Sequence, residues 1–152
     1  RQPRRDLLQP AVGRHRSVQR QRAGAAKGKL AQNHPVAAYL DAAFWTDTID
    51  EDGHVHAEDV YGFSDIAPDA LDDVEADVRG FLTANLPECA AWCRMFGASQ
   101  LGHDLWLTRN GHGTGFWDRR YASKLGERLT VMCKPMGESS LYVGDDGRVW
   151  FS

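Results

Sequence analysis

Apolar residues recur every three or four positions in four stretches of the chain, which is the spacing of one face of an α-helix. The first stretch starts at Pro35, with Asn33 or His34 as its cap, and reaches about Trp45. The second starts at Pro68. Its apolar stripe consists of Leu71, Val74, Val78, Phe81 and Leu82. The pattern predicts two amphipathic helices in this half of the chain.

Two further helices are predicted downstream. One runs from Pro87 to about Phe96, and Gly97 follows it as a terminal glycine would. The other is stopped by Pro135 and Gly137. Its buried stripe consists of Leu125, Leu129, Met132 and Cys133.

Between these helices the period changes from helical to alternating. Residues 103–109 alternate, with His103, Leu105, Leu107 and Arg109 on one side and Asp104, Trp106 and Thr108 on the other. This alternation predicts a strand. Asn110-Gly111 is a strong turn signal before a return through Phe116 and Trp117, so a hairpin is expected over residues 103–118.

A second hairpin is predicted at residues 141–143 and 148–151, around the turn Gly144-Asp145-Asp146-Gly147. Residues 46–66 are acidic and rich in turn formers, which predicts a loop with a short strand near residues 60–63.

These elements predict an α+β domain with a small antiparallel β-sheet. The sheet has about four strands in two hairpins and is packed by about four helices, in the order ααα-ββ-α-ββ. One face is expected to be aliphatic: Leu105, Leu107, Leu141, Val143, Val149 and Phe151. The other collects Trp106, Tyr142 and Trp150. Either a second layer covers these rings or they form a recognition surface.

Charge divides the chain into two parts. Residues 1–30 hold nine Lys or Arg against the single acid Asp6, whereas residues 41–88 hold fourteen Asp or Glu against the single base Arg79. The first part has too few apolar residues to fold, so we expect a disordered basic arm at 1–32 and a single α+β domain at 33–152. The arm is either a nucleic-acid contact or an extension without a binding role.

The number of cysteines and the length of the apolar runs indicate in which compartment the protein works. Cys89, Cys93 and Cys133 are an odd number, which argues against a disulfide framework and for buried thiols in a reducing compartment. No apolar run approaches the roughly 20 residues of a membrane span. We therefore expect a cytoplasmic protein without membrane contact, and neither a cofactor nor a metal site.

Three blocks of the chain resemble a known family. GHDLWLTRNGHGTGFWDR, then LGERLT, then GESSLYVGDDGRVWF resemble the C-terminal half of small proteins of tailed bacteriophages and prophages. FWTDTIDEDG and SDIAPDALDDVEADVRGFL resemble that family's acidic N-terminal half, so the likeness covers roughly residues 36–152. The resemblance implies a phage origin and a cytoplasmic location in the host cell. It implies no mechanism, because the family has no assigned activity.

The predicted hairpin carries a set of groups that could perform acid–base chemistry. The candidate catalytic residues are His103, Asp104, Arg109, His112, Asp118 and Arg119. Histidines, carboxylates and an arginine are the minimum kit for hydrolysis or phosphodiester chemistry. The structural alternative is that Arg109 pairs with an acid such as Asp118 while Asn110 and the glycines shape the turn. A small hydrolase or nuclease-like enzyme is the alternative function.

Binding is the function that the sequence favours over turnover. The candidate binding residues are Trp106, Asn110, Trp117, Tyr142, Trp150, Asp69, Asp72, Asp73 and Asp77. The acidic helix could imitate the charge of nucleic acid and occupy the basic surface of a host protein, or it could be a solubilising face. The sequence thus predicts a phage-encoded accessory protein that binds a basic host protein, with nucleic-acid contact only through the arm.

Overall fold

The structure is a computed structural model that describes residues 34–152. The predicted basic arm at 1–32 and the cap position Asn33 lie outside the described residues.

The described chain is mostly helical. Its α-helices are α2 (His34–Thr46), α3 (Ala57–Val60), α4 (Pro68–Ala84), α5 (Leu86–Phe96), α6 (Ala98–Arg109) and α7 (Ser123–Cys133). Single 3-10 turns are η1 (Phe63–Asp65), η2 (Phe116–Asp118), η3 (Arg120–Ala122) and η4 (Lys134–Met136). Strands β1 (Leu141–Val143) and β2 (Val149–Phe151) form one antiparallel pair. The α+β class therefore agrees broadly with the prediction, but the four strands and their predicted order are not found.

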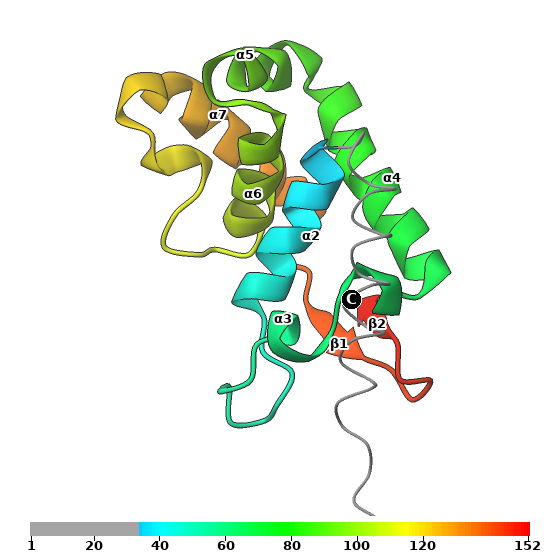
Figure 1. Ribbon diagram of the computed structural model, residues 1–152. Coiled ribbons are helices and arrows are strands. Elements are labelled where there is room, and N and C mark those ends of the chain that lie inside the picture. The colour runs from blue at the N-terminus through cyan, green and yellow to red at the C-terminus, as the bar shows by residue number, and fades with distance from the viewer. Residues whose placement is uncertain (1–33) are drawn as a thin grey trace, which may run out of the picture.

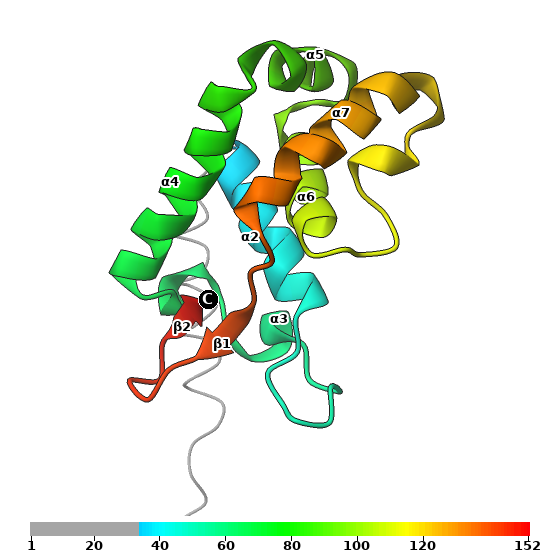
Figure 2. The same cartoon turned by 180° about the vertical axis from the view of Figure 1, so that it is seen from behind.

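Helices α2 and α6 pack against each other at the centre of the molecule (Figures 1 and 2). Helix α4 lies alongside α2, α5 crosses one end, and the β1–β2 hairpin and α3 lie at the opposite end. Helix α2 is buried around most of its circumference because the core surrounds it. Its buried residues are Val36, Ala38, Tyr39, Leu40, Ala42, Ala43 and Phe44.

The four predicted helices are confirmed. Pro35 and Pro68 stand in the first turns of α2 and α4, where a missing N–H costs nothing. Gly97 ends α5 with φ +92°, a left-handed conformation that glycine adopts without steric cost. The same residue is the N-cap of α6, so the chain turns directly from one helix into the next.

The predicted strand at residues 103–109 is wrong, because this segment belongs to α6. Leu105, Trp106 and Leu107 are all buried, although they point to three different sides of the helix. A helix in the centre of the core is apolar nearly all round, so its sequence loses the polar face that makes a helical period visible. The apparent alternation came from Asp104 and Thr108, which flank the apolar run.

Asn110-Gly111 caps a helix and does not turn a hairpin. Gly111 has φ +66°, and the N–H groups of Gly111 and His112 bond to the carbonyls of Thr108 and Leu107, 3.2 and 3.0 Å away. These contacts satisfy the last free carbonyls of α6. The predicted return strand at Phe116 and Trp117 is the 3-10 turn η2.

The C-terminal hairpin is confirmed, with Tyr142 opposite Trp150. Leu141 and Val149 face the core as predicted, but Leu105 and Leu107 reach the core from α6 and share no sheet face with them. The short strand predicted near residues 60–63 is also wrong, because α3 and η1 occupy that segment.

Across residues 34–152, no helix combines the length and apolar character that crossing a lipid bilayer would need.

Candidate functional site

Arg109, a candidate catalytic residue, connects four parts of the molecule. Its guanidinium donates to the carbonyls of Gly137 and Met136, each at 2.9 Å, and to the Tyr39 hydroxyl at 2.7 Å. It also pairs with a carboxylate oxygen of Asp77 at 3.3 Å, and its side chain is only 5% exposed. These contacts hold the C-terminal end of α6 to α2, α4 and η4. The predicted partner Asp118 is not involved.

Asp104 and Arg119 form an ion pair between a buried carboxylate and a guanidinium whose side chain is 33% exposed. Asp104 is fully buried, and its Oδ1 accepts from Gln100 at 3.0 Å and from Arg119 at 3.3 Å. The Arg119 guanidinium lies over the ring of Phe96, 5.6 Å from its centre. Burial raises the pKa of Asp104, although Gln100 and Arg119 oppose that shift.

The remaining catalytic candidates are dispersed. Asp118 is exposed and accepts a hydrogen bond from Thr114 at 2.9 Å. His103 and His112 are half-buried. Within residues 34–152, no hydrogen bond connects either histidine to Asp104 or Asp118. The arrangement is that of structural contacts, with one half-buried ion pair and one buried arginine.

The aromatic candidates do not share a surface. Trp106 is fully buried in α6, where its indole N–H donates to Thr46 at 2.8 Å. Trp117 on η2 and Tyr142 on β1 are about half exposed. Trp150 is half-buried and donates to Asp146 in the hairpin turn. The predicted sheet face of Trp106, Tyr142 and Trp150, expected to be either covered by a second layer or a recognition surface, is therefore not formed.

Asn110 also has a structural contact. Its side-chain oxygen accepts a hydrogen bond from the Ser139 N–H at 2.8 Å, and its amide nitrogen donates to the Trp106 carbonyl at 3.0 Å. These bonds tie the end of α6 to the segment before β1.

The acidic candidates Asp69, Asp72, Asp73 and Asp77 are all exposed on helix α4. Three of them, Asp69, Asp73 and Asp77, repeat every four residues and form one row along the helix. The side of α4 next to this row is buried through Ala70, Val74, Val78 and Phe81. The core therefore fixes the direction in which the carboxylates point. We call this row together with Asp72 the α4 acidic face.

A cavity of about 300 Å³ adjoins the α4 acidic face. It lies where α4 passes the C-terminal strand, and both views show α4 beside β2 (Figures 1 and 2). Its lining comes from α2, α4, the segment before β1, and the chain end: Tyr39, Asp73, Val74, Ala76, Asp77, Ser139, Phe151 and Ser152. We call it the α4 cavity. It brings two carboxylates and three hydroxyl groups together with an apolar wall.

The hydroxyl of Tyr39 stays protonated at any physiological pH. Burial raises the pKa of Tyr39 to about 12, against the opposing effect of Arg109. A neutral hydroxyl can both donate and accept a hydrogen bond, and the Tyr39 hydroxyl already accepts one from Arg109. Ser139 also bonds to this hydroxyl, so two of the three hydroxyl groups in the lining of the α4 cavity bond to each other.

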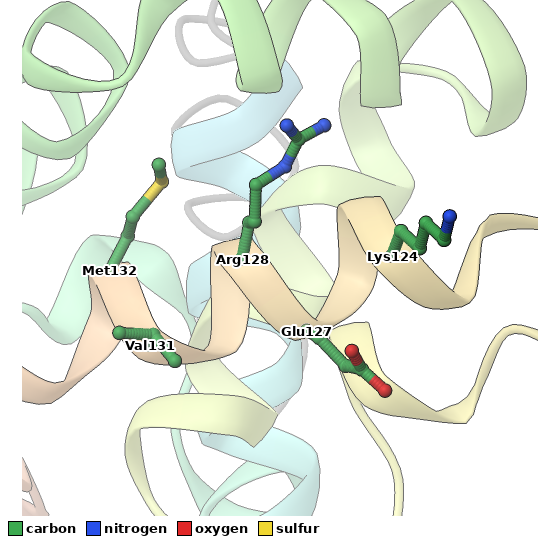
Figure 3. Close-up of a pocket in the computed structure, with 5 residues that line it drawn as sticks. All are labelled: Lys124, Glu127, Arg128, Val131 and Met132. Carbon is green, nitrogen blue, oxygen red and sulfur yellow. The ribbon is translucent and has the colours of Figure 1, made fainter.

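A larger hollow, of about 530 Å³, lies along the outer face of α7. The described residues that line it, Lys124, Glu127, Arg128, Val131 and Met132, all come from this one helix. Figure 3 shows Lys124, Arg128 and Met132 pointing to one side of α7 and Glu127 and Val131 to the other. Because these side chains do not point toward a common position, they cannot together contact one small group. The α4 cavity, whose lining comes from several elements, is therefore the better candidate site.

One group of side chains has the composition of a metal site. Asp50, Asp52 and His54 each offer one ligand atom within 4.8 Å of the others. Asp50 is already occupied by the loop, since its carboxylate accepts from the N–H groups of Val55 and His54 at 2.7 and 3.0 Å. The Val55 bond in particular lowers the pKa of Asp50. Asp50 therefore closes the loop through these hydrogen bonds, and Asp50, Asp52 and His54 also place metal-ligating atoms close together.

The cysteines are buried or half-buried, as predicted. Cys89, Cys93 and Cys133 are all free thiols, and burial raises the pKa of Cys89 and of Cys133 to about 12. Thiols with such pKa values are unreactive at neutral pH.

The sequence identified the acidic half of the site but missed its other half. Tyr39 is far along the chain from Ser139, Phe151 and Ser152, and these residues carry no shared motif. Their meeting depends on how α2 and the C-terminal hairpin pack against α4, which no local pattern records.

The chain matches no protein-family model, no curated protein and no solved structure.

Proposed function

We propose that this protein acts by binding a host protein with a basic surface, and that the α4 acidic face is its contact surface. The resemblance of its sequence blocks to those of phage and prophage proteins supports a phage-encoded accessory protein that works in the host cytoplasm.

The observation that carries the proposal is the presentation of carboxylates on a rigid helix. Asp69 and Asp77 are eight residues apart, about 12 Å along the axis of α4 at 1.5 Å per residue. The span holds five acids, of which the four on the α4 acidic face give one carboxylate per about 4 Å, close to the 3.4 Å per charge of one DNA strand. A basic groove that accepts nucleic acid would accept this row for the same electrostatic reason.

The contacts of the catalytic candidates do not favour the enzyme alternative. A hydrolytic site needs a base within hydrogen-bonding reach of a nucleophile or a water position. Asp104, Arg109 and Arg119 are held by buried structural contacts, and Asp118 is bonded to Thr114 on the surface. Binding requires none of these groups to react.

The proposal is tested by affinity capture from nuclease-treated host lysate. The wild-type chain is compared with a variant that carries Asp69→Asn, Asp72→Asn, Asp73→Asn and Asp77→Asn. We expect the wild-type chain to retain a host protein that the variant loses, and we expect this retention to weaken as salt concentration rises.

A matched control separates the position of the charge from its amount. The control carries Glu51→Gln, Glu58→Gln, Asp59→Asn and Glu127→Gln, four exposed acids outside α4. It should retain the same host protein as the wild-type chain. Equal retention by the wild-type chain and the α4 variant would contradict the proposal.

A further inference from the structure

The α4 cavity is lined by carboxylates, hydroxyl groups and apolar side chains. A contact surface that attracts its partner by charge alone would not need this combination. We infer that the cavity is a socket for one guanidinium group, the side chain of an arginine on the protein partner. The inference rests on the proposed function, because it specifies how the α4 acidic face would recognise that partner.

The charge in the cavity fits a single cation. Asp77 is paired with Arg109, whose guanidinium is also bound by Tyr39 and two carbonyls. Asp73 has no ion pair with any residue between 34 and 152. Among the described residues, one of the two carboxylates in the lining thus has no opposite charge beside it, and one incoming guanidinium would neutralise it.

The walls fit the two halves of an arginine side chain. Val74, Ala76 and Phe151 give the cavity an apolar side, against which the aliphatic stem can pack. The Phe151 ring is held in place by an edge contact with Trp106, with 6.0 Å between ring centres. Phe151 also lines the cavity, so its ring is near the position that a guanidinium would occupy there.

The polar atoms favour arginine over lysine. The Asp73 carboxylate offers two oxygens to one head group, and the hydroxyls of Ser139 and Ser152, which already bond to Tyr39 and to Ser140, line the same cavity. A guanidinium presents five donors in a planar fork and can satisfy several acceptors at once, whereas an ammonium is a compact, strongly hydrated charge. The volume of about 300 Å³ lies at the lower end for ligand sites and suits one side chain.

The first test uses peptides as probes of the full-length protein. The amide signals of ¹⁵N-labelled protein are followed by NMR while the capped tripeptide Gly-Arg-Gly is added. Citrulline and lysine versions of the peptide serve as ligand controls. We expect saturable shifts at residues that line the α4 cavity, with citrulline binding more than about tenfold weaker because it lacks the charge. Absence of saturable shifts there, or equal binding of the citrulline peptide, would overturn the inference.

The second test compares neighbouring acids on the same helix. Asp73 lines the cavity and Asp72 does not, so Asp73→Asn and Asp72→Asn remove the same charge from adjacent positions. We expect Asp73→Asn to weaken binding of the arginine peptide about tenfold and Asp72→Asn to weaken it less than about twofold. Equal effects would show that only the general field attracts the peptide, and would reject the socket.

The outcomes distinguish this inference from the proposed function. Loss of host-protein capture by the α4 variant, together with equal effects of Asp72→Asn and Asp73→Asn, rejects the socket and keeps the contact surface. Peptide binding that depends on Asp73, together with capture that survives neutralisation of α4, supports a guanidinium site and rejects the proposed partner surface. The amide spectrum of each variant reports in the same experiment that it is folded.

Discussion

Asp104 carries a carboxylate into the centre of the molecule, where ionisation is unfavourable. Its Oδ2 and the Nε of Arg119 are buried without a hydrogen-bond partner among the described residues. Removing one charge of a buried pair costs stability when the other charge is left without a partner, but the Arg119 side chain is 33% exposed and can be partly solvated by water. An asparagine at this position keeps an oxygen for Gln100 and Arg119.

We expect Asp104→Asn to gain stability relative to the wild-type chain as the pH rises. The folded pKa of Asp104 lies above its ordinary value of 3.8. As the pH rises through these two values, the unfolded wild-type chain releases its proton first, so the wild-type chain loses stability that the asparagine variant keeps. Urea unfolding at about pH 3 and about pH 7 measures the difference. A gain that shrinks with rising pH would mean that attraction to Arg119 outweighs burial.

Tyr39, like Asp104, is a buried titratable residue whose substitution should change the free energy of unfolding in a pH-dependent way. Tyr39→Phe removes the hydroxyl that accepts from Arg109, and we expect a loss of about 1–2 kcal/mol in the free energy of unfolding. Because the folded pKa is about 12 and the ordinary value is 10.0, the tyrosine's contribution should be lost as the pH rises through that window. Urea unfolding at neutral and alkaline pH tests both points. Tyr142→Phe, at an exposed ring, should leave the free energy of unfolding at neutral pH unchanged.

At the scale of elements, the crossing of α2 and α6 determines the centre of the fold. Gly102 lies where α6 meets the first turn of α2, and a Cβ atom there would overlap the backbone carbonyl of Pro35. Backbone atoms cannot rotate out of the way as a side chain can, so the two helices would have to separate. The absence of a side chain at this position is what permits their close approach.

We expect Gly102→Ala to destabilise the protein by about 1–3 kcal/mol, because it overpacks this crossing. Gly80→Ala is the matched control on α4, where a Cβ atom would meet nothing within 4 Å. Alanine is the better helix former, so Gly80→Ala should stabilise the protein by up to about 1 kcal/mol. Thermal or urea unfolding of both variants tests the pair. Equal effects of the same sign would contradict the packing explanation.

Element boundaries also show which parts of the fold the sequence predicts. Helix α4 was predictable because it lies on the surface, where Pro68 marks its start and the polar face contrasts with the buried stripe. Helix α6 was not, because it is buried on nearly all sides. Leu101 and Leu105 are four residues apart, and Gly111 stands just beyond the last turn, so a weak helical signal was present.

At the scale of the whole molecule, the α4 acidic face carries a cost in stability. Asp73 has Asp69 four residues before it and Asp77 four residues after it, and like charges at that spacing repel along a helix. A surface kept for binding often keeps such repulsion, since a partner of opposite charge relieves it.

We therefore expect Asp73→Asn to be more stable than the wild-type chain by about 0.5 kcal/mol at low salt. The gain should disappear in about 1 M NaCl, where charges more than about 3 Å apart are screened. Urea unfolding at the two salt concentrations gives the result. Asp73→Asn is also the variant expected to lose arginine-peptide binding, so a stable protein with impaired binding would separate function from folding. A loss of stability at low salt would contradict the repulsion.

The sequence by itself determined what depends on neighbouring residues. The starts of α2 and α4, the glycine between α5 and α6, the C-terminal hairpin and the row of acids on α4 all follow from proline, glycine and residue spacing, which act locally. Tertiary structure alone decided what depends on distant partners. The helical state of residues 103–109 follows from burial among other helices, because apolar residues on every side leave no local period. The α4 cavity likewise exists only because packing brings Tyr39, Asp73 and Phe151 together, although they are far apart along the chain.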